Sequence, residues 1–229
     1  MGASESPAAT GERHLLNSLR RLLGRHRQRI LGLFVGVFVP LCLFAILARE
    51  VVHRQPPPWD VAVLTWIHAH SSPLADRVML GATRVGTWYG VVPGSILLGL
   101  WLLARRNMAR FSFFALSMLG SWLLSDATKR LFGRERPVLW PSPAPETSFS
   151  FPSGHAMGSM ALAVSVAVLA WHTRYRWVAV VGGAAFTVVV SGSRLYLGVH
   201  YPTDVLGAWL ASLAWVLGLR QILLSRAHR

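Results

Sequence analysis

The sequence predicts an all-α fold: a polytopic membrane bundle of six transmembrane helices, with short interfacial helices on the outer side. Of the 229 residues, 53% are hydrophobic and only 14% are charged, against roughly 25% charged in an ordinary soluble domain. The apolar residues also form blocks long enough to cross a ~30 Å hydrocarbon layer. The net charge of +14 would suit nucleic acid. The arginines, however, flank apolar blocks, as is typical of membrane boundaries, so we expect no nucleic-acid partner.

The first 29 residues differ from the rest of the chain. Residues 1–12 are small and polar and are expected to be disordered. Residues 13–29 place leucines at helical spacing among arginines. Two interpretations stay open: an amphipathic helix on an anionic cytoplasmic leaflet, or a solvated basic tail that only fixes orientation. We therefore divide the chain into a basic cytoplasmic segment (1–29), a six-span domain (30–225) and a cytoplasmic tail (226–229).

The first expected span is residues 30–48, an uncharged apolar block. It exceeds the apolar region of a signal peptide, and no small-x-small cleavage site precedes Arg49, so we expect an uncleaved span. Further spans are expected at 86–104, 111–128, 155–171, 177–192 and 204–224.

Basic residues set the expected orientation. They follow the second, fourth and sixth spans, at Arg105, Arg106, Arg110, Arg174, Arg176, Arg226 and Arg229. By the positive-inside rule these ends and both termini are cytoplasmic, in the inner (plasma) membrane, and the other connections face outward. The longest of these, 49–85, holds Trp59 and Trp66 in an amphipathic stretch, and Ser72 with Pro73 opens a further helix. We expect both helices to lie on the outer leaflet.

The first polar motif runs from Lys129 to Pro137 in an outward connection. Lys129 and Arg136 are seven residues apart, which places them on one helix face, and Pro137 ends the helix just before it. Two cations on one face suit a multiply charged oxyanion. Alternatively, both are boundary cations that reach toward the headgroups.

The second motif surrounds the start of an apolar helix, Phe151 to Ser159. Ser153 is a candidate N-cap, and Gly154 permits close approach of a ligand to the backbone. The free N–H groups of the first helical turn favour an anion, and His155 lies beside them. The alternative is an ordinary capped helix with an interfacial histidine.

The third motif runs from Ser193 to Asp204 and includes Arg194. His200 and Asp204 are four residues apart, with Thr203 as the expected N-cap of the last span. A carboxylate beside an imidazole can keep one ring nitrogen protonated, which makes the other a better nucleophile. The alternatives are an incidental histidine or a metal site; few neutral ligands among so many cations argue against metal.

The three motifs fall on the same expected membrane face, and together they favour phosphoryl transfer. That chemistry needs positive charge on the phosphoryl oxygens, an in-line nucleophile and an acid for the leaving group. The segments match the patterns KxxxxxxRP, PSGH and SRxxxxxHxxxD without a substitution. In them the sequence resembles the type 2 phosphatidic-acid phosphatase superfamily, which also includes vanadium haloperoxidases and glucose-6-phosphatase. With the six-span layout, the resemblance covers roughly residues 30–225.

The resemblance implies a role for each motif residue. The phosphate oxygens would be held by Lys129, Arg136, Ser153, the amide of Gly154 and Arg194. His200 would attack phosphorus and form a phosphohistidine, Asp204 would orient His200, and His155 would protonate the leaving oxygen. The family needs no metal or other cofactor for this. Arg130 and Arg134 lie outside the motif positions and are assigned no catalytic role.

The expected function is that of a membrane lipid phosphatase acting on a phosphate monoester or pyrophosphate, with a prenyl pyrophosphate such as undecaprenyl pyrophosphate preferred. The alternatives are a phosphatidylglycerophosphate or phosphatidate phosphatase, a lipid phosphotransferase, and a non-enzymatic lipid transporter or scaffold. The expected partners are the lipid phosphate and membrane lipids, with Trp59, Trp66 and Phe151 placed to meet acyl or prenyl chains. The sequence gives no indication of oligomeric state.

Overall fold

The computed structural model describes residue 27 and residues 30–52 and 56–224. Within these ranges all regular structure is helical and no strand occurs, so the predicted all-α class is confirmed. The predictions for residues 1–29 and 226–229 lie, apart from residue 27, outside the described residues.

The described helices are longest in the segments predicted to span. In chain order they are η1 (Phe34–Phe38, a π-helical turn), α2 (Val39–Val52), α3 (Pro58–Ala69), α4 (Pro73–Arg84), η2 (Val85–Tyr89, π-helical), α5 (Val91–Ala104), α6 (Met108–Phe132), α7 (Gly154–Ala170), α8 (Arg176–Tyr196), α9 (Pro202–Leu219) and η3 (Arg220–Leu224, π-helical).

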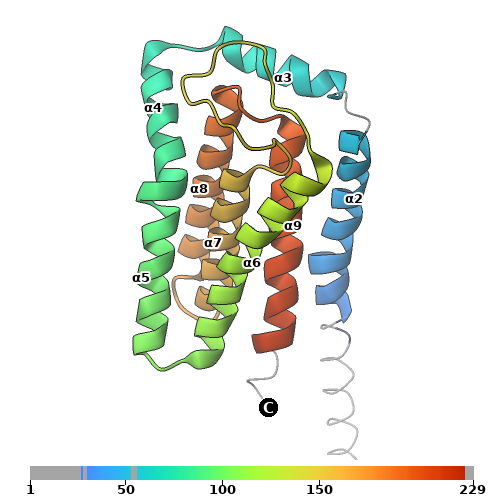
Figure 1. Cartoon of the computed structure of the whole chain (residues 1–229). Coiled ribbons are helices and arrows are strands. Elements are labelled where there is room, and N and C mark those ends of the chain that lie inside the picture. Colours follow the sequence, from blue (N-terminus) through green and yellow to red (C-terminus); the bar gives the residue numbers. More distant parts are fainter. Residues whose placement is uncertain (1–26, 28–29, 53–55, 225–229) are drawn as a thin grey trace, which may run out of the picture.

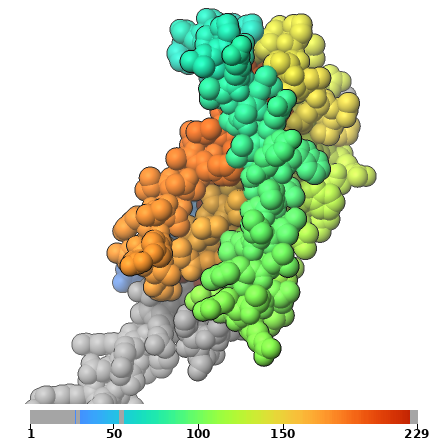
Figure 2. Space-filling view, turned by 90° about the vertical axis from the view of Figure 1, so that its left-hand side faces the viewer, coloured from blue at the N-terminus to red at the C-terminus, as the bar shows by residue number. Residues whose placement is uncertain are grey.

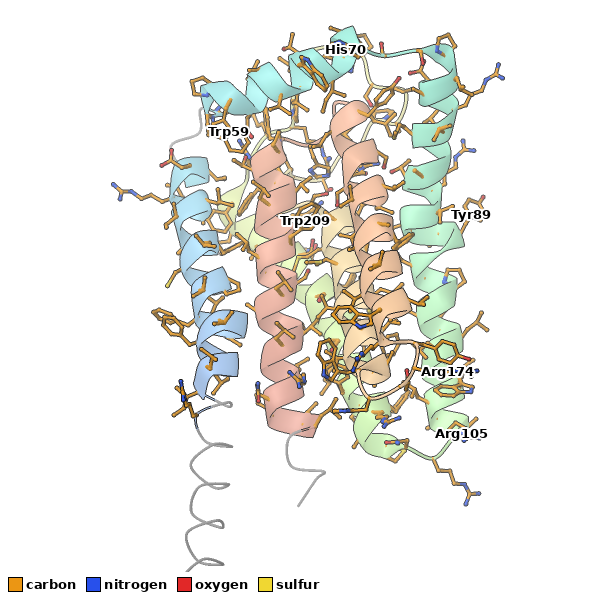
Figure 3. All side chains as sticks on the ribbon, turned by 180° about the vertical axis from the view of Figure 1, so that it is seen from behind. Trp59, His70, Tyr89, Arg105, Arg174 and Trp209 are labelled. Atoms are coloured by element: carbon orange, nitrogen blue, oxygen red, sulfur yellow. The ribbon has the colours of Figure 1, made fainter. Side chains whose placement is uncertain are left out.

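The long helices run side by side along one axis, and α3 lies across one end of the bundle (Figure 1). We call this the site end. The α6–α7 loop, residues 133–153, also lies there. Trp59 and His70 mark the site end in Figure 3, and Arg105 and Arg174 mark the opposite end. Helix α7 packs against α6, α8 and α9 and is the most enclosed of the long helices.

Five helical stretches are long and apolar enough to cross a membrane: Ile30–Val52, Pro73–Ala104, Met108–Phe132, Arg176–Tyr196 and Pro202–Leu224. Helix α7 is apolar as well but has only 17 residues. At 1.5 Å per residue its axis is about 26 Å long, slightly less than the ~30 Å hydrocarbon layer.

The segment that opens at Ser72 differs from its prediction. The hydroxyl of Ser72 accepts a hydrogen bond from the amide of Ala75, and Pro73 is the first helical residue, as expected. The helix does not stop there, however. It continues through η2 into α5, giving one 32-residue stretch, Pro73–Ala104, and Figure 2 shows α4 and α5 as one teal-to-green column. Because α4 also packs along α8, this segment is not a separate interfacial helix.

The interior of the bundle is unusually polar and its surface unusually apolar. Ser117, Ser121 and Ser125 recur every four residues along α6 and are all buried, on one face of the helix. Small residues such as these let helices approach closely in a membrane. At buried Gly207, a Cβ atom would lie only 2.5 Å from the ring of Phe151. The outward faces of α2, α5 and α8 carry exposed apolar side chains instead, which suits contact with hydrocarbon.

Three expected details are wrong. Helix α6 ends at Phe132, with Gly133 in the left-handed conformation (φ 55°) that commonly terminates helices. Arg136 therefore lies beyond the helix, and it does not share a helix face with Lys129. Helix α9 is capped by Tyr201 rather than Thr203.

The third wrong detail concerns Phe151, which does not face lipid. It is fully buried and packs against Phe44 and Phe132. Trp59 and Trp66 are 43% and 65% exposed, so these two remain available for contact with lipid.

Candidate active site

The predicted site residues come together at the site end, although separate parts of the chain carry them. Helix α6 brings Lys129 in its last turn, and α8 brings Arg194 in the same way. The start of α7 supplies Ser153, Gly154 and His155. The α6–α7 loop supplies Arg136, the α8–α9 connection supplies His200, and the first turn of α9 supplies Asp204.

A carboxylate that was not predicted lies at the centre of this cluster. Glu146 accepts a hydrogen bond from Arg136 Nη2 at 2.6 Å and pairs through its other oxygen with Arg194 Nη2. That second oxygen is also 3.7 Å from His155 Nδ1. Burial alone would raise the pKa of Glu146, but Arg194 and Arg136 outweigh it and lower the pKa to about 2. The group is therefore an anion at any physiological pH.

His200 is completely buried beside this anion pocket. Its Nε2 atom is 3.0 Å from Arg136 Nη1, and its Nδ1 atom is 3.4 Å from Asp204 Oδ2. A guanidinium can only donate hydrogen bonds, so Nε2 must be the acceptor nitrogen and Nδ1 carries the proton, directed at Asp204. Burial, and then Arg136 and Arg194, lower the pKa of His200 well below 6.5. The ring is therefore neutral, with the lone pair of Nε2 on the side of the cations.

Asp204 is held in place by several donors. Its carboxylate accepts from the hydroxyl of Ser150, from the amide of Tyr201 at 2.8 Å and from Arg134 Nη1 at 2.5 Å. The side chain is fully buried. This carboxylate cannot turn away from His200 without breaking these bonds.

Two buried donors in the cluster have no protein partner. Ser153 is the N-cap residue of α7, as predicted, but its hydroxyl makes no capping bond and is buried without a hydrogen bond. The Nε atom of Arg194 is buried and unpaired in the same way. At Gly154 a Cβ atom would come within 4.0 Å of Lys129 Nζ, so the glycine leaves open the space next to that ammonium.

Comparison with known proteins places this arrangement in a family. The model of the PAP2 superfamily matches residues 110–227, a stretch that carries every predicted site residue. The chain belongs to the PAP2 superfamily.

Two curated relatives show how far the PAP2 likeness extends. Phosphatidylglycerophosphatase B of Bacillus subtilis (strain 168) is 28% identical over 177 residues, which cover 75% of this chain and 87% of the relative. The undecaprenyl-diphosphatase of Sulfolobus acidocaldarius is 26% identical over 187 residues, covering 78% and 86%.

A solved structure extends the PAP2 likeness to the fold. The crystal structure described as the first transmembrane PAP2 type phosphatidylglycerolphosphate phosphatase, from Bacillus subtilis, superposes with a TM-score of 0.73. It is 26% identical in sequence, and the match covers 82% of this chain and 95% of that one. Together with the five apolar helices, this likeness identifies the chain as a multi-pass membrane protein.

The candidate site is supported by two buried residues that sequence reasoning missed. Arg134, only 7% exposed, donates to Asp204 Oδ1, to Asp60 Oδ2 at 3.0 Å and to the hydroxyl of Thr203 at 2.7 Å. Asp60 lies in α3 and is fully buried, and burial raises its pKa. The bridge therefore ties α3 to the start of α9 and supports Asp204 from behind. The sequence signal for Arg134 was that four cations crowd the segment from Lys129 to Arg136.

His155 also has a partner that no motif revealed. Its Nε2 atom lies 2.9 Å from the hydroxyl of Thr87 in η2, and its Nδ1 atom faces Glu146. Thr87 and Glu146 come from segments 59 residues apart in the chain, so only the fold could join them. Within the part of the chain that the structure describes, no three His, Cys, Asp or Glu residues are grouped as a metal site.

Proposed function

We propose that this PAP2 protein is a membrane lipid phosphatase that removes phosphate from a lipid phosphate or diphosphate through a phosphohistidine. One observation carries the proposal: the site already holds an oxyanion, Glu146, that faces His155 and is joined through Arg136 to His200. His155 faces one oxygen of the Glu146 carboxylate. Arg136, which holds the other oxygen, contacts the acceptor nitrogen of His200. A phosphoryl group in that position would have a nucleophile on one side and a proton donor on the other.

The chemical step follows from the tautomer of His200. Once Arg136 has turned from Nε2 to the phosphoryl oxygens, the Nε2 lone pair attacks phosphorus. An N–P bond forms and the bond from phosphorus to the lipid oxygen breaks. His155, which must bind a second proton before this step, gives that proton to the leaving oxygen and becomes neutral. Asp204 retains the Nδ1 proton and stabilises the positive ring that develops. Water, deprotonated by His155, then attacks the phosphohistidine and releases phosphate.

Lys129, Arg136 and Arg194 balance the charge on the phosphoryl oxygens in this proposal. Arginine pairs with phosphate through two parallel hydrogen bonds, while lysine acts as a point charge. The unpaired hydroxyl of Ser153 and the amide of Gly154, at the N-terminus of α7, add neutral donors where the helix dipole favours an anion. Such fixed donors are the largest contribution to many phosphoryl-transfer rates.

We further propose that α7 is the sixth span and that the site end faces the outer side of the plasma membrane, with both termini cytoplasmic. In support, Arg105 and Arg174 lie at the opposite end (Figure 3), as the positive-inside rule requires. Helix α3, with exposed Trp59 and Trp66, would then be an interfacial helix. Tryptophan is enriched at that depth of the bilayer.

The test is phosphate release by purified protein in detergent, with EDTA present. We keep undecaprenyl diphosphate as the first substrate and phosphatidylglycerophosphate as its direct competitor, since relatives named for both match at similar identity. Replacing the nucleophile, His200→Ala, should lower kcat by about a thousandfold or more, roughly 4 kcal/mol in barrier. The matched control is His172→Ala, at the exposed α7–α8 connection. Loss of activity with EDTA, or an active His200→Ala variant, would overturn the mechanism.

A further inference from the structure

One short segment of the α6–α7 loop contacts all three cations that are predicted to bind phosphate. This segment, residues 145–149, is called here the Glu146 segment. Glu146 pairs with Arg136 and Arg194. Ser148 accepts from Lys129 Nζ at 2.9 Å and from Arg136 Nη2 at 3.1 Å, and its carbonyl accepts from Arg136 Nε at 2.7 Å. The donors that a phosphate would need are therefore already engaged by the chain itself.

The Glu146 segment uses these donors incompletely. A carboxylate offers two oxygens, whereas a phosphoryl group offers three non-bridging oxygens. The hydroxyl of Ser153 and Nε of Arg194, the residue that pairs with Glu146, stay buried and unpaired, although buried polar groups in proteins are nearly always hydrogen-bonded. The arrangement thus matches a ligand with more acceptor atoms than a carboxylate has.

The flanks of the Glu146 segment are fastened independently of the cations. On one side, the ring of Trp140 stacks on His68 with 4.0 Å between ring centroids, and the hydroxyl of Ser142 donates to the carbonyl of Leu197 at 2.7 Å. On the other side, Ser150 donates to Asp204.

Between these anchors the chain forms no helix or strand, and Thr147, Ser148 and Phe149 are exposed. The loop passes over the site end (Figure 1). The Glu146 segment can therefore leave the cations while both flanks stay bound.

We propose that Glu146 is an internal competitor of the substrate: its carboxylate occupies the phosphate site in the free protein, and a phosphoryl group binds by displacing it. The inference rests on the proposed function for the identity of the natural ligand. It makes Glu146 a determinant of substrate affinity, since every substrate phosphate must first break the contacts of Glu146 with Arg136 and Arg194. Glu146 takes no part in the bond changes at phosphorus.

The experiment removes the competing charge and measures binding of inorganic phosphate by calorimetry on the purified full-length protein. Glu146→Gln and Glu146→Ala should each bind phosphate about tenfold more tightly than the wild type, because charge-assisted hydrogen bonds no longer have to be broken. The matched control is Glu135→Gln, an exposed carboxylate in the same loop, which should bind as the wild type does. Phosphate should also raise the melting temperature of both Glu146 variants more than that of the wild type.

The outcomes separate this inference from the proposed function. Unchanged or weaker phosphate binding in both Glu146 variants would overturn it, and so would a fall in kcat with no change in KM, because Glu146 would then act in catalysis. If the wild type releases no phosphate from any lipid while the variants still bind phosphate more tightly, the proposed function fails and the competitor role stands. With an active wild type, the competitor role requires a KM roughly tenfold lower in Glu146→Gln.

Discussion

The buried bridge between Asp60, Arg134 and Asp204 makes a strong prediction about stability. Arg134→Met keeps most of the side-chain volume but leaves two buried carboxylates without their shared cation. Both carboxylates are fully buried, and the arginine is 7% exposed. Breaking a buried ion pair by removing one partner costs about 3–5 kcal/mol. For a chain of this size that loss lowers the melting temperature on the order of 10 °C.

Arg130 provides the matched control. It lies four residues earlier and also forms an ion pair, with Asp126 at 3.0 Å, but its side chain is 77% exposed. Exposed pairs of this spacing contribute about 0.3–0.5 kcal/mol, so Arg130→Met should melt within about 2 °C of the wild type. The change can be followed by the fluorescence of the ten tryptophans during heating in detergent. Equal melting temperatures for the two variants would refute the assignment of Arg134 as a structural counter-charge.

A second substitution tests the reason for the loss. In the Arg134→Met background, Asp60→Asn removes one of the two uncompensated charges, so part of the stability should return. Burial already raises the pKa of Asp60, and without Arg134 it should rise further. The stability deficit of Arg134→Met should therefore shrink as the pH falls, because a protonated carboxyl needs no cation. A deficit that does not depend on pH would indicate lost packing instead of lost charge compensation.

Two further predictions concern helix packing and pH. Gly207→Ala should destabilise the protein by roughly 1–3 kcal/mol, because the new methyl group would clash with Phe151. Gly182→Ala, with nothing within 4 Å of the new Cβ, should not destabilise it, and thermal melting of both variants distinguishes them. Because the pKa of His200 is lowered by folding, the unfolded chain binds more protons below about pH 6.5. Stability should fall there with decreasing pH, by up to ~1.4 kcal/mol per unit. His200→Gln should make that slope shallower, and His172→Gln should leave it unchanged.

The sequence predicted the all-α class and the motif residues that meet at the site end, because both depend on local patterns. Apolar blocks of span length identify helices in a membrane without any knowledge of their partners. Three polar motifs at the ends of such blocks must lie at the membrane boundary, and alternation of the connections puts them on one side. Their convergence, with His200 beside both Arg136 and Asp204, needed only that topology.

The sequence could not supply the contacts that cross between segments. Where the helix after Ser72 ends depends on its packing along α8, because neither Gly90 nor Pro93 ends the stretch that contains them. The end of α6 is set by Gly133, whose positive φ terminates the helix four residues before Pro137. Arg134 lies outside the motif positions, and its partner Asp60 lies 74 positions earlier in the chain, a separation at which local spacing carries no information.

Charge balance joins the two missed carboxylates to the proposed chemistry. The site gathers four cations, Lys129, Arg134, Arg136 and Arg194. Asp60 and Asp204 are counter-charges that belong to the fold, because Arg134 binds both and Thr203 binds Asp60. That leaves two positive charges, of which Glu146 balances one.

A phosphate dianion in place of Glu146 would balance both positive charges. In a largely buried site, full neutralisation is worth more than in bulk solvent. The free protein thus holds its cations together with an anion weak enough to be replaced. A permanently empty cluster of arginines would repel itself, and a fully neutral one would not bind substrate.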